Sequence, residues 1–204
     1  MDKARFLSLI EKPLFGGAIS AVQEAGLFDL IAHWDAHYAD RDARWLAYIL
    51  ATAHHEVDRT FQPIKEYGGD AYYHDMYDIE GRRPDVALRL GNVAPGDGVR
   101  FHGRGFVQLT GRANYADWQR RLDMDLTSNR SAADRVLERD AAMRILFEGM
   151  MLGTFTGRKL ADFIIGVRQD WRNARQVVNR LDRADLIAGY AIGFDTALRV
   201  ARRA

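Results

Sequence analysis

Two glutamates in the first third of the chain have the spacing of an acid–base pair. Glu56 ends an apolar segment, directly after His55, and Glu66 follows ten residues later across a turn that contains Pro63. Hydrolysis of a glycosidic bond needs one protonated carboxyl group, which assists the leaving oxygen, and one ionised carboxylate, which activates water. The two glutamates therefore point to acid–base chemistry on a sugar polymer.

Glu56 is the stronger of the two candidates because it lies on the apolar face of a predicted helix. It comes seven positions after Ile49 and three after Ala53, so all three share one helical stripe. A charged side chain in such a stripe is unexpected unless it faces a cleft. Partial burial disfavours the ionised carboxylate, which suits a general acid. The alternative is a helix-end glutamate that pairs with a nearby arginine.

The second acid has several candidates. Glu66 is placed to fold back toward Glu56, whereas Asp58 follows too closely to face it. Glu80 and Asp85 come from the same polar segment, and each also fits an ordinary solvated acid. A carboxyl separation of about 6.5–9.5 Å would admit a water molecule and invert the anomeric centre.

The segment Gly103 to Tyr115 supplies polar residues that suit water and sugar binding. The hydroxyl of Thr110 can donate and accept, so it can hold the attacking water. We expect a short strand from Phe106 to Thr110, in which Gln108 and Thr110 share one face, toward the cleft. The alternative is a strand whose polar side chains merely face solvent.

The adjacent His54 and His55 do not indicate a metal site. Neighbouring side chains on a helix diverge by about 100° and cannot converge on one ion. Arg59 stands where the zinc-protease pattern His-Glu-x-x-His places its second histidine. We therefore predict no metal and no cofactor, and expect His55 to support Glu56 or the wall of a cleft.

Composition limits the class of protein. The 204 residues contain no cysteine, which excludes disulfides and thiolate metal sites. No apolar run approaches the roughly 20 residues that span a bilayer. With no signal-peptide pattern from Met1 to Gly17, we expect synthesis in a host cytoplasm and action after release. The chain from Arg158 to Ala204 carries a net charge of +5, which suits an anionic partner or simply a solvated, arginine-rich helix face.

Helical periodicity dominates both ends of the chain, so we expect a mainly α-helical fold. The middle, about residues 57 to 105, holds three of the four prolines and many glycines, and is predicted to form loops with a short hairpin. Helices are expected at about 18–37, 43–56, 114–122, 132–152, 160–167, 171–181 and 184–203.

These motifs together resemble glycoside hydrolase family 19, the class I chitinase group, and especially its phage and prophage lysozyme-like branch. The resemblance covers most of the chain. It is carried by residues 14–17, 44–56, 61–66, 103–115, 174–179 and 184–191.

The resemblance implies a single catalytic domain over residues 1–204, with a lysozyme-like helical fold and a cleft lined by about residues 57–112. It makes Glu56 the general acid, Glu66 the general base and Thr110 the residue that positions water. Two positions depart from the family pattern, Val57 in place of Thr and Arg180 in place of Gly. The implied sugar-binding residues are His55, Arg104, Gln108, Asn114, Tyr115 and Asn179.

The catalytic motif does not distinguish peptidoglycan from chitin, because both polymers contain β-1,4-linked N-acetylglucosamine. We expect a peptidoglycan-degrading endolysin that acts as a monomer, without nucleic acid and without membrane insertion. The alternatives are a chitinase and a non-catalytic module that binds wall glycan.

Overall fold

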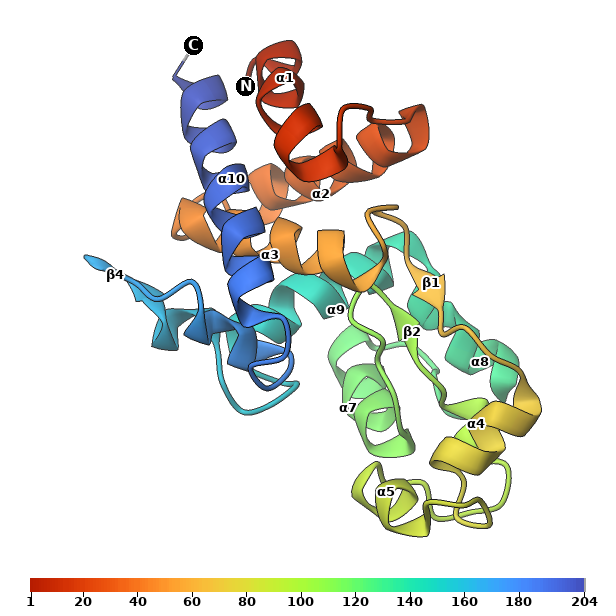
Figure 1. The fold of residues 1–204 in the computed structure, drawn as a ribbon. Helices are drawn as coiled ribbons and strands as arrows, with labels where there is room; N and C mark the ends of the chain where they lie inside the picture. Colours follow the sequence, from red (N-terminus) through yellow and green to blue (C-terminus); the bar gives the residue numbers. More distant parts are fainter. Residues whose placement is uncertain (204) are drawn as a thin grey trace. The chain divides into compact units, whose positions relative to one another are not determined.

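The computed structural model describes residues 1–203, which form two compact units. Unit 1 consists of Met1–Gln62 and Leu146–Ala204, and unit 2 consists of Pro63–Ile145. The fold is mainly α-helical, as predicted, and Figure 1 shows its helices and short strands. Within residues 1–203, no helix combines the length and the apolar character that crossing a membrane requires.

Unit 1 is built around the helix α3 (Ala43–Glu56), which α10 (Ala184–Arg202) crosses and packs against (Figure 1). The helices α1 (Lys3–Phe15) and α2 (Ala21–His37) complete this layer, with α1 beside α10. Every residue of α3 from Leu46 to His54 is buried. The catalytic candidate Glu56 is therefore attached to the core of its unit.

Local sequence explains the limits of α3. The side chain of Asp42 accepts a hydrogen bond from the backbone N–H of Arg44 and caps the first turn. After Val57, Asp58 and Arg59 both adopt positive φ angles, 46° and 63°, which reverse the chain and end the helix. The predicted bounds of 43–56 are confirmed.

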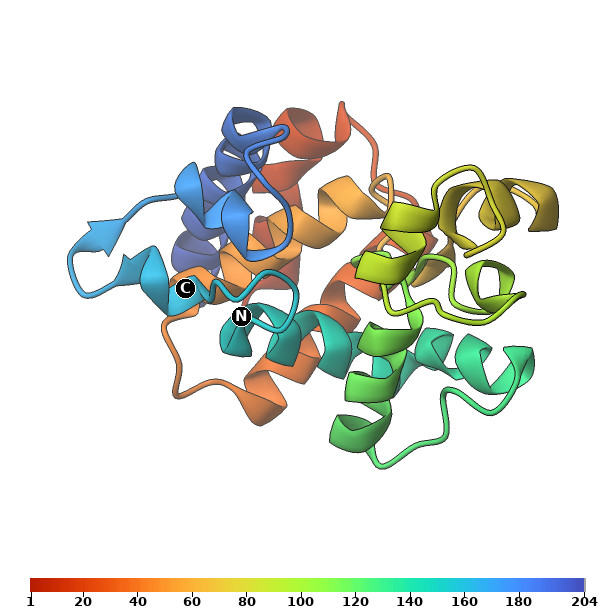
Figure 2. The ribbon, with the colours of Figure 1, turned by 90° about the horizontal axis from the view of Figure 1, so that it is seen from below.

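The segment before α10 differs from the prediction. The helices expected at 160–167 and 171–181 are wrong. The chain instead forms a 3-10 turn, η2 (Leu160–Asp162), and a hairpin of β3 (Ile164–Ile165) with β4 (Arg168–Gln169), followed by the 3-10 helix η3 (Asn173–Val177). Gly166 reverses the chain with a φ of 55°. Figure 2 shows the hairpin extending outward from unit 1.

Unit 2 contains a short antiparallel pair, in which Ile64 of β1 (Ile64–Lys65) faces Gly105 of β2 (Arg104–Gly105). The segment from about residue 57 to 105, which was predicted to form loops, is more helical than expected. The helices α4 (Asp70–Tyr77), α5 (Pro84–Arg89) and α6 (Asp97–Arg100) lie between its two short strands. They are followed by α7 (Arg112–Leu122), α8 (Arg130–Asp134), η1 (Arg135–Leu137) and α9 (Arg139–Leu152), the last of which contains the boundary between the units.

The strand predicted from Phe106 to Thr110 is wrong. These residues form a tight turn in which Gln108 has a φ of 53°. The turn is closed by two backbone hydrogen bonds between Arg104 and Leu109, of 2.8 and 3.2 Å. Leu109 still reaches the core of unit 2, and Gln108 folds back over the turn instead of alternating along a strand.

Candidate active site

In unit 1, Glu56 is held by a buried arginine. Nη1 of Arg175 donates to Oε1 of Glu56 at 2.6 Å, while Nε of Arg175 donates to the backbone oxygen of Asp182 at 3.0 Å. The side chain of Arg175 is 2% exposed and that of Glu56 is 19% exposed. The pairing considered as an alternative is present, and it fixes the carboxylate while leaving it partly accessible.

The sequence interpretation did not single out Arg175, although it lies in the segment 174–179 that carries the family resemblance. It comes from η3, 119 residues after Glu56. The available signal was a charged residue between Ala174 and Val177, which are both fully buried. An arginine buried between these residues needs a partner, and here the partner is the predicted acid.

The two histidines before Glu56 have different environments. His54 is buried among Phe15, Phe61, Tyr190 and Phe194, and this burial lowers its pKa to about 4. His55 is partly exposed, and Arg175, not His55, is the residue hydrogen-bonded to the Glu56 carboxylate. A supporting role for His55 therefore remains a prediction.

In unit 2, Glu66 directly follows β1 and is fixed at both carboxylate oxygens. The hydroxyl of Tyr77 donates to Oε1 at 2.6 Å, and the backbone N–H of Gly103 donates to Oε2 at 3.0 Å. Burial, followed by the hydrogen bond to Glu66, raises the pKa of Tyr77. Tyr77 therefore keeps its proton and remains a donor to the carboxylate.

Gly103 permits a close packing of predicted site residues. A Cβ atom at this position would lie 2.9 Å from Oε1 of Gln108 and 3.0 Å from Oε2 of Glu66. Gln108 is fixed in turn, because its Nε2 donates to the backbone oxygen of Gly105 at 3.1 Å. The structure thus brings Glu66 and Gln108 together over one glycine.

Thr110 and Asn114 continue the same cluster. Oγ1 of Thr110 donates to the backbone oxygen of Gln108 at 2.8 Å, and Nδ2 of Asn114 donates to the backbone oxygen of Thr110 at 2.7 Å. Asn114 is exposed and Thr110 is half-buried. In unit 2, Gln108, Thr110 and Asn114 therefore form one hydrogen-bonded set, and Glu66 lies beside it across Gly103.

Arg104 and Tyr115 occupy the interior of unit 2, and both are 0% exposed. Nη1 of Arg104 donates to the Tyr115 hydroxyl at 2.9 Å, and Nε of Arg104 donates to Asp134 at 2.7 Å. The Tyr115 hydroxyl also donates to the backbone oxygen of His102, next to Gly103. In this structure the two residues stiffen the segment that carries Gly103 and present no surface to sugar.

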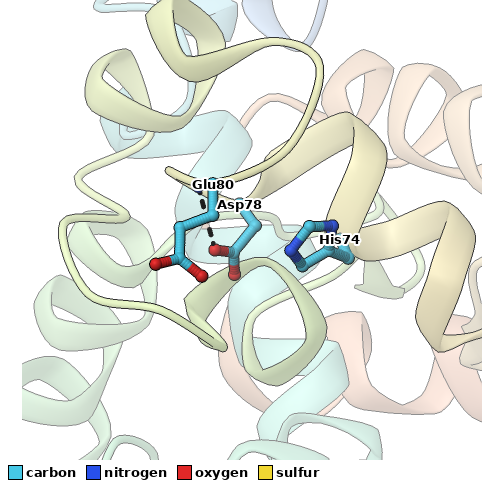
Figure 3. A group of neighbouring side chains, drawn as sticks. All are labelled: His74, Asp78 and Glu80. Atoms are coloured by element: carbon cyan, nitrogen blue, oxygen red, sulfur yellow. Dashed lines mark hydrogen bonds between the residues drawn. The ribbon is translucent and has the colours of Figure 1, made fainter.

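The other acids that were candidates for the base have different surroundings. Asp58 and Asp85 form exposed ion pairs with Arg59 at 4.0 Å and Arg89 at 3.0 Å. Glu80 belongs to a group with His74 and Asp78, shown in Figure 3, whose possible ligand atoms all lie within 4.8 Å of one another.

The group in Figure 3 was not predicted from the sequence. Asp78 is fully buried, and its oxygens accept hydrogen bonds from the backbone N–H groups of Glu80 at 3.2 Å and Gly98 at 2.9 Å. These bonds tie the end of α4 to α6. The position of Asp78 is therefore explained by the loop that it stabilises.

Asn179, the last predicted sugar-binding residue, lies in unit 1 immediately after η3. It is exposed, and its backbone N–H donates to the backbone oxygen of Arg175 at 3.0 Å. It also lines an open cavity of about 480 Å³ together with Gln176 and Arg180. The residue is thus adjacent, along the chain and by hydrogen bond, to the arginine that holds Glu56.

Comparison of the chain with protein-family models and with curated proteins gave no match. The candidate residues are Glu56, Arg175 and Asn179 in unit 1, and Glu66, Gln108, Thr110 and Asn114 in unit 2.

Proposed function

We propose that the protein is a glycoside hydrolase of the family 19 type, with a lysozyme-like fold, that cleaves β-1,4 bonds of bacterial peptidoglycan. The observation that carries the proposal is that both predicted acids are partly exposed and fixed by hydrogen bonds. Arg175 holds Glu56, while Tyr77 and Gly103 hold Glu66. Oriented carboxylates of this kind are what general acid–base hydrolysis requires.

In the proposed mechanism Glu56 is the general acid. It donates a proton to the glycosidic oxygen as the bond to the anomeric carbon breaks, and it becomes a carboxylate. Arg175 then faces a full negative charge, so its hydrogen bond to Oε1 strengthens during the step. Interactions that strengthen toward the transition state accelerate the reaction.

Glu66 is the general base in this mechanism. It takes a proton from the water that attacks the anomeric carbon, and Thr110 helps to position that water. Tyr77 cannot accept this proton, because it already donates its own to Oε1 of Glu66. The bonds from Tyr77 and Gly103 restrict rotation of the carboxylate, which lowers the entropic cost of a productive geometry.

The first experiment measures reducing-end release from purified peptidoglycan and from colloidal chitin by the wild type, Glu56→Gln and Glu66→Gln. We expect release from peptidoglycan, and a loss of about 10²–10⁴-fold in each variant, the usual contribution of a general acid or base. Both substitutions preserve side-chain size, and circular dichroism checks the fold. Proton NMR of the first product is expected to show an inverted anomer.

Other outcomes lead to different conclusions. Undiminished release by Glu56→Gln would contradict the proposed acid. Faster release from chitin than from peptidoglycan would move the protein to the chitinases. Tight binding to the wall without release of reducing ends from either polymer would indicate a glycan-binding module.

A further inference from the structure

A cavity in unit 1 is lined by two arginines and by uncharged residues. Its volume is about 480 Å³, and its lining includes Thr156, Arg158, Gln176, Asn179 and Arg180. Two arginines contribute to this lining and no acidic residue does. Such a surface attracts an anion and gains nothing from an uncharged sugar alone.

The two arginines are available to a ligand. Both are exposed, and neither guanidinium forms an ion pair with a carboxylate anywhere in residues 1–203. Other arginines nearby are engaged, since Arg175 binds Glu56 and Arg172 binds Asp185 at 2.9 Å. Arg158 and Arg180 thus differ from Arg172 and Arg175 in having no carboxylate partner within residues 1–203.

Within residues 1–203, the acidic residues beside the cavity form no ion pair with Arg158 or Arg180. Asp162 and Asp170 line a second cavity, of about 410 Å³, which shares Arg158 and Gln176 with the first. Asp162 accepts a hydrogen bond from the backbone N–H of Lys159 at 3.0 Å, and Asp170 accepts from Asn173 at 2.9–3.1 Å. Both carboxylates are therefore committed to local turns.

The cavity is linked to the proposed acid through consecutive residues of η3. Arg175 holds Glu56, and the next residue, Gln176, lines the cavity. Asn179 is bonded to Arg175 through the backbone and lines the same cavity. A ligand bound there would contact the segment that orients Glu56.

We propose that this cavity binds a carboxylate carried by the peptide-bearing sugar of peptidoglycan, with Arg158 and Arg180 as the residues that recognise it. The inference rests on the proposed glycosidase function and adds a reason for its substrate choice. Chitin consists of uncharged N-acetylglucosamine, whereas peptidoglycan carries carboxylates on its stem peptides and, once these are removed, on its lactyl ethers. The planar guanidinium fork matches a carboxylate with two parallel hydrogen bonds.

Binding is measured first, in a background that does not cleave the ligand. Isothermal titration calorimetry with Glu56→Gln compares three probes: soluble glycan strands with intact peptides, the same strands after amidase removes the peptides, and chitohexaose. Adding Arg158→Gln and Arg180→Gln together is expected to raise the dissociation constant for peptide-bearing strands about tenfold. The constant for chitohexaose should stay the same.

The three probes also identify the source of the carboxylate. An effect confined to intact strands assigns the stem peptide, an effect confined to peptide-free strands assigns the lactyl carboxylate, and an effect on both shows that the cavity accepts a carboxylate from either source. Arg172→Gln is the control for surface charge, because it removes one arginine charge from unit 1 outside the cavity lining and is compared with each single substitution, Arg158→Gln or Arg180→Gln. It is expected to leave all three dissociation constants unchanged.

Two results would overturn the inference. One is an equal effect of the double substitution on chitohexaose and on the anionic strands, or no effect on either. The other is an equal weakening by Arg172→Gln, which would assign the effect to general surface charge. Reducing-end release by the wild type is scored separately, so failure of the glycosidase proposal would appear as no cleavage while the binding comparison still decides the role of the cavity.

Discussion

At the scale of single residues, the environment of Glu56 combines two features that usually exclude each other. The carboxylate is attached to a helix that is buried from Leu46 to His54, yet it is partly exposed and bonded to one arginine. Charges placed in apolar surroundings require a partner, and removing that partner is costly. Arg175 meets this requirement through a bond to one carboxylate oxygen, Oε1.

Replacement of Arg175 tests whether it positions Glu56. Arg175→Lys keeps the charge but has no planar fork, so it cannot bond Glu56 and the Asp182 backbone in the same geometry. We expect kcat on peptidoglycan to fall about tenfold to a hundredfold while KM changes little, since small misplacements of a catalytic group have effects of this size. Steady-state kinetics measures both constants.

Arg172→Lys is the control for Arg175→Lys, because it makes the same substitution at an arginine that does not contact Glu56. Arg172→Lys alters an exposed arginine of the same unit and should leave kcat unchanged. If Arg175→Lys raised KM and left kcat intact, Arg175 would contribute to substrate binding and not to the placement of the acid.

Residues whose contacts are local in the sequence could be predicted, whereas residues whose partners are distant in the sequence could not. Glu56 was identified because its helical neighbours, Ile49 and Ala53, are local. Arg175 was missed because its partner lies 119 residues away, and no periodic pattern reports such a pairing. Arg104 and Tyr115 were assigned to sugar by resemblance, whereas their burial reflects contacts to Asp134 and His102 that the sequence does not reveal.

At the scale of elements, prediction succeeded where a long apolar stripe coincided with a cap. The helix α3 has both, and its bounds agree to the residue. Short elements carry too few residues for a period to be recognised, so β3 was predicted to be part of a helix and β4 was not predicted. The strand predicted at 106–110 does not form because Gln108 has a positive φ. A non-glycine residue rarely adopts this conformation, so the sequence did not indicate it.

Replacing Gly103, which directly precedes β2, tests whether the position of Glu66 matters for activity. In Gly103→Ala, the new Cβ would come within 3.0 Å of both Oε1 of Gln108 and Oε2 of Glu66. These are the ends of flexible side chains, so we expect them to move while the fold persists. Activity should fall about a hundredfold because the base is displaced, with little change in melting temperature.

Gly69→Ala supplies the control in the same unit. A Cβ at Gly69 meets no atom within 4 Å, so both activity and melting temperature should be retained. A fully active Gly103→Ala protein would show that the contact between Glu66 and Gly103 is not needed for turnover.

At the scale of the whole molecule, the division into two units was only half visible in the sequence. The change in composition near residue 57 anticipates the start of unit 2 at Pro63. Its end at Ile145 falls inside α9, where the helix continues without a break and contains no proline, and where the one glycine, Gly149, lies four residues further on. A change in composition can indicate a boundary that lies in a loop. It cannot indicate a boundary that lies within a continuous helix, as the end of unit 2 does.

The stability of unit 1 should depend on pH through His54. Its pKa in the folded protein is lowered to about 4, chiefly by burial. In the unfolded chain a histidine has a pKa of about 6.5, so below that pH the unfolded state binds a proton that the folded state refuses. Stability is therefore lost as pH falls from about 6.5 toward 4.

Urea unfolding at pH 7 and pH 5 measures this effect. For the wild type we expect His54 to lower the free energy of unfolding by about 2 kcal/mol between the two values. His102 of unit 2, whose pKa burial also lowers, adds to the total. His54→Phe and His54→Leu each remove the proton-binding ring from its aromatic surroundings and should reduce the pH dependence by the His54 share alone. A pH dependence that both variants retain in full would show that unit 1 accommodates a protonated His54, and that its packing against Phe15, Tyr190 and Phe194 is looser than the contacts imply.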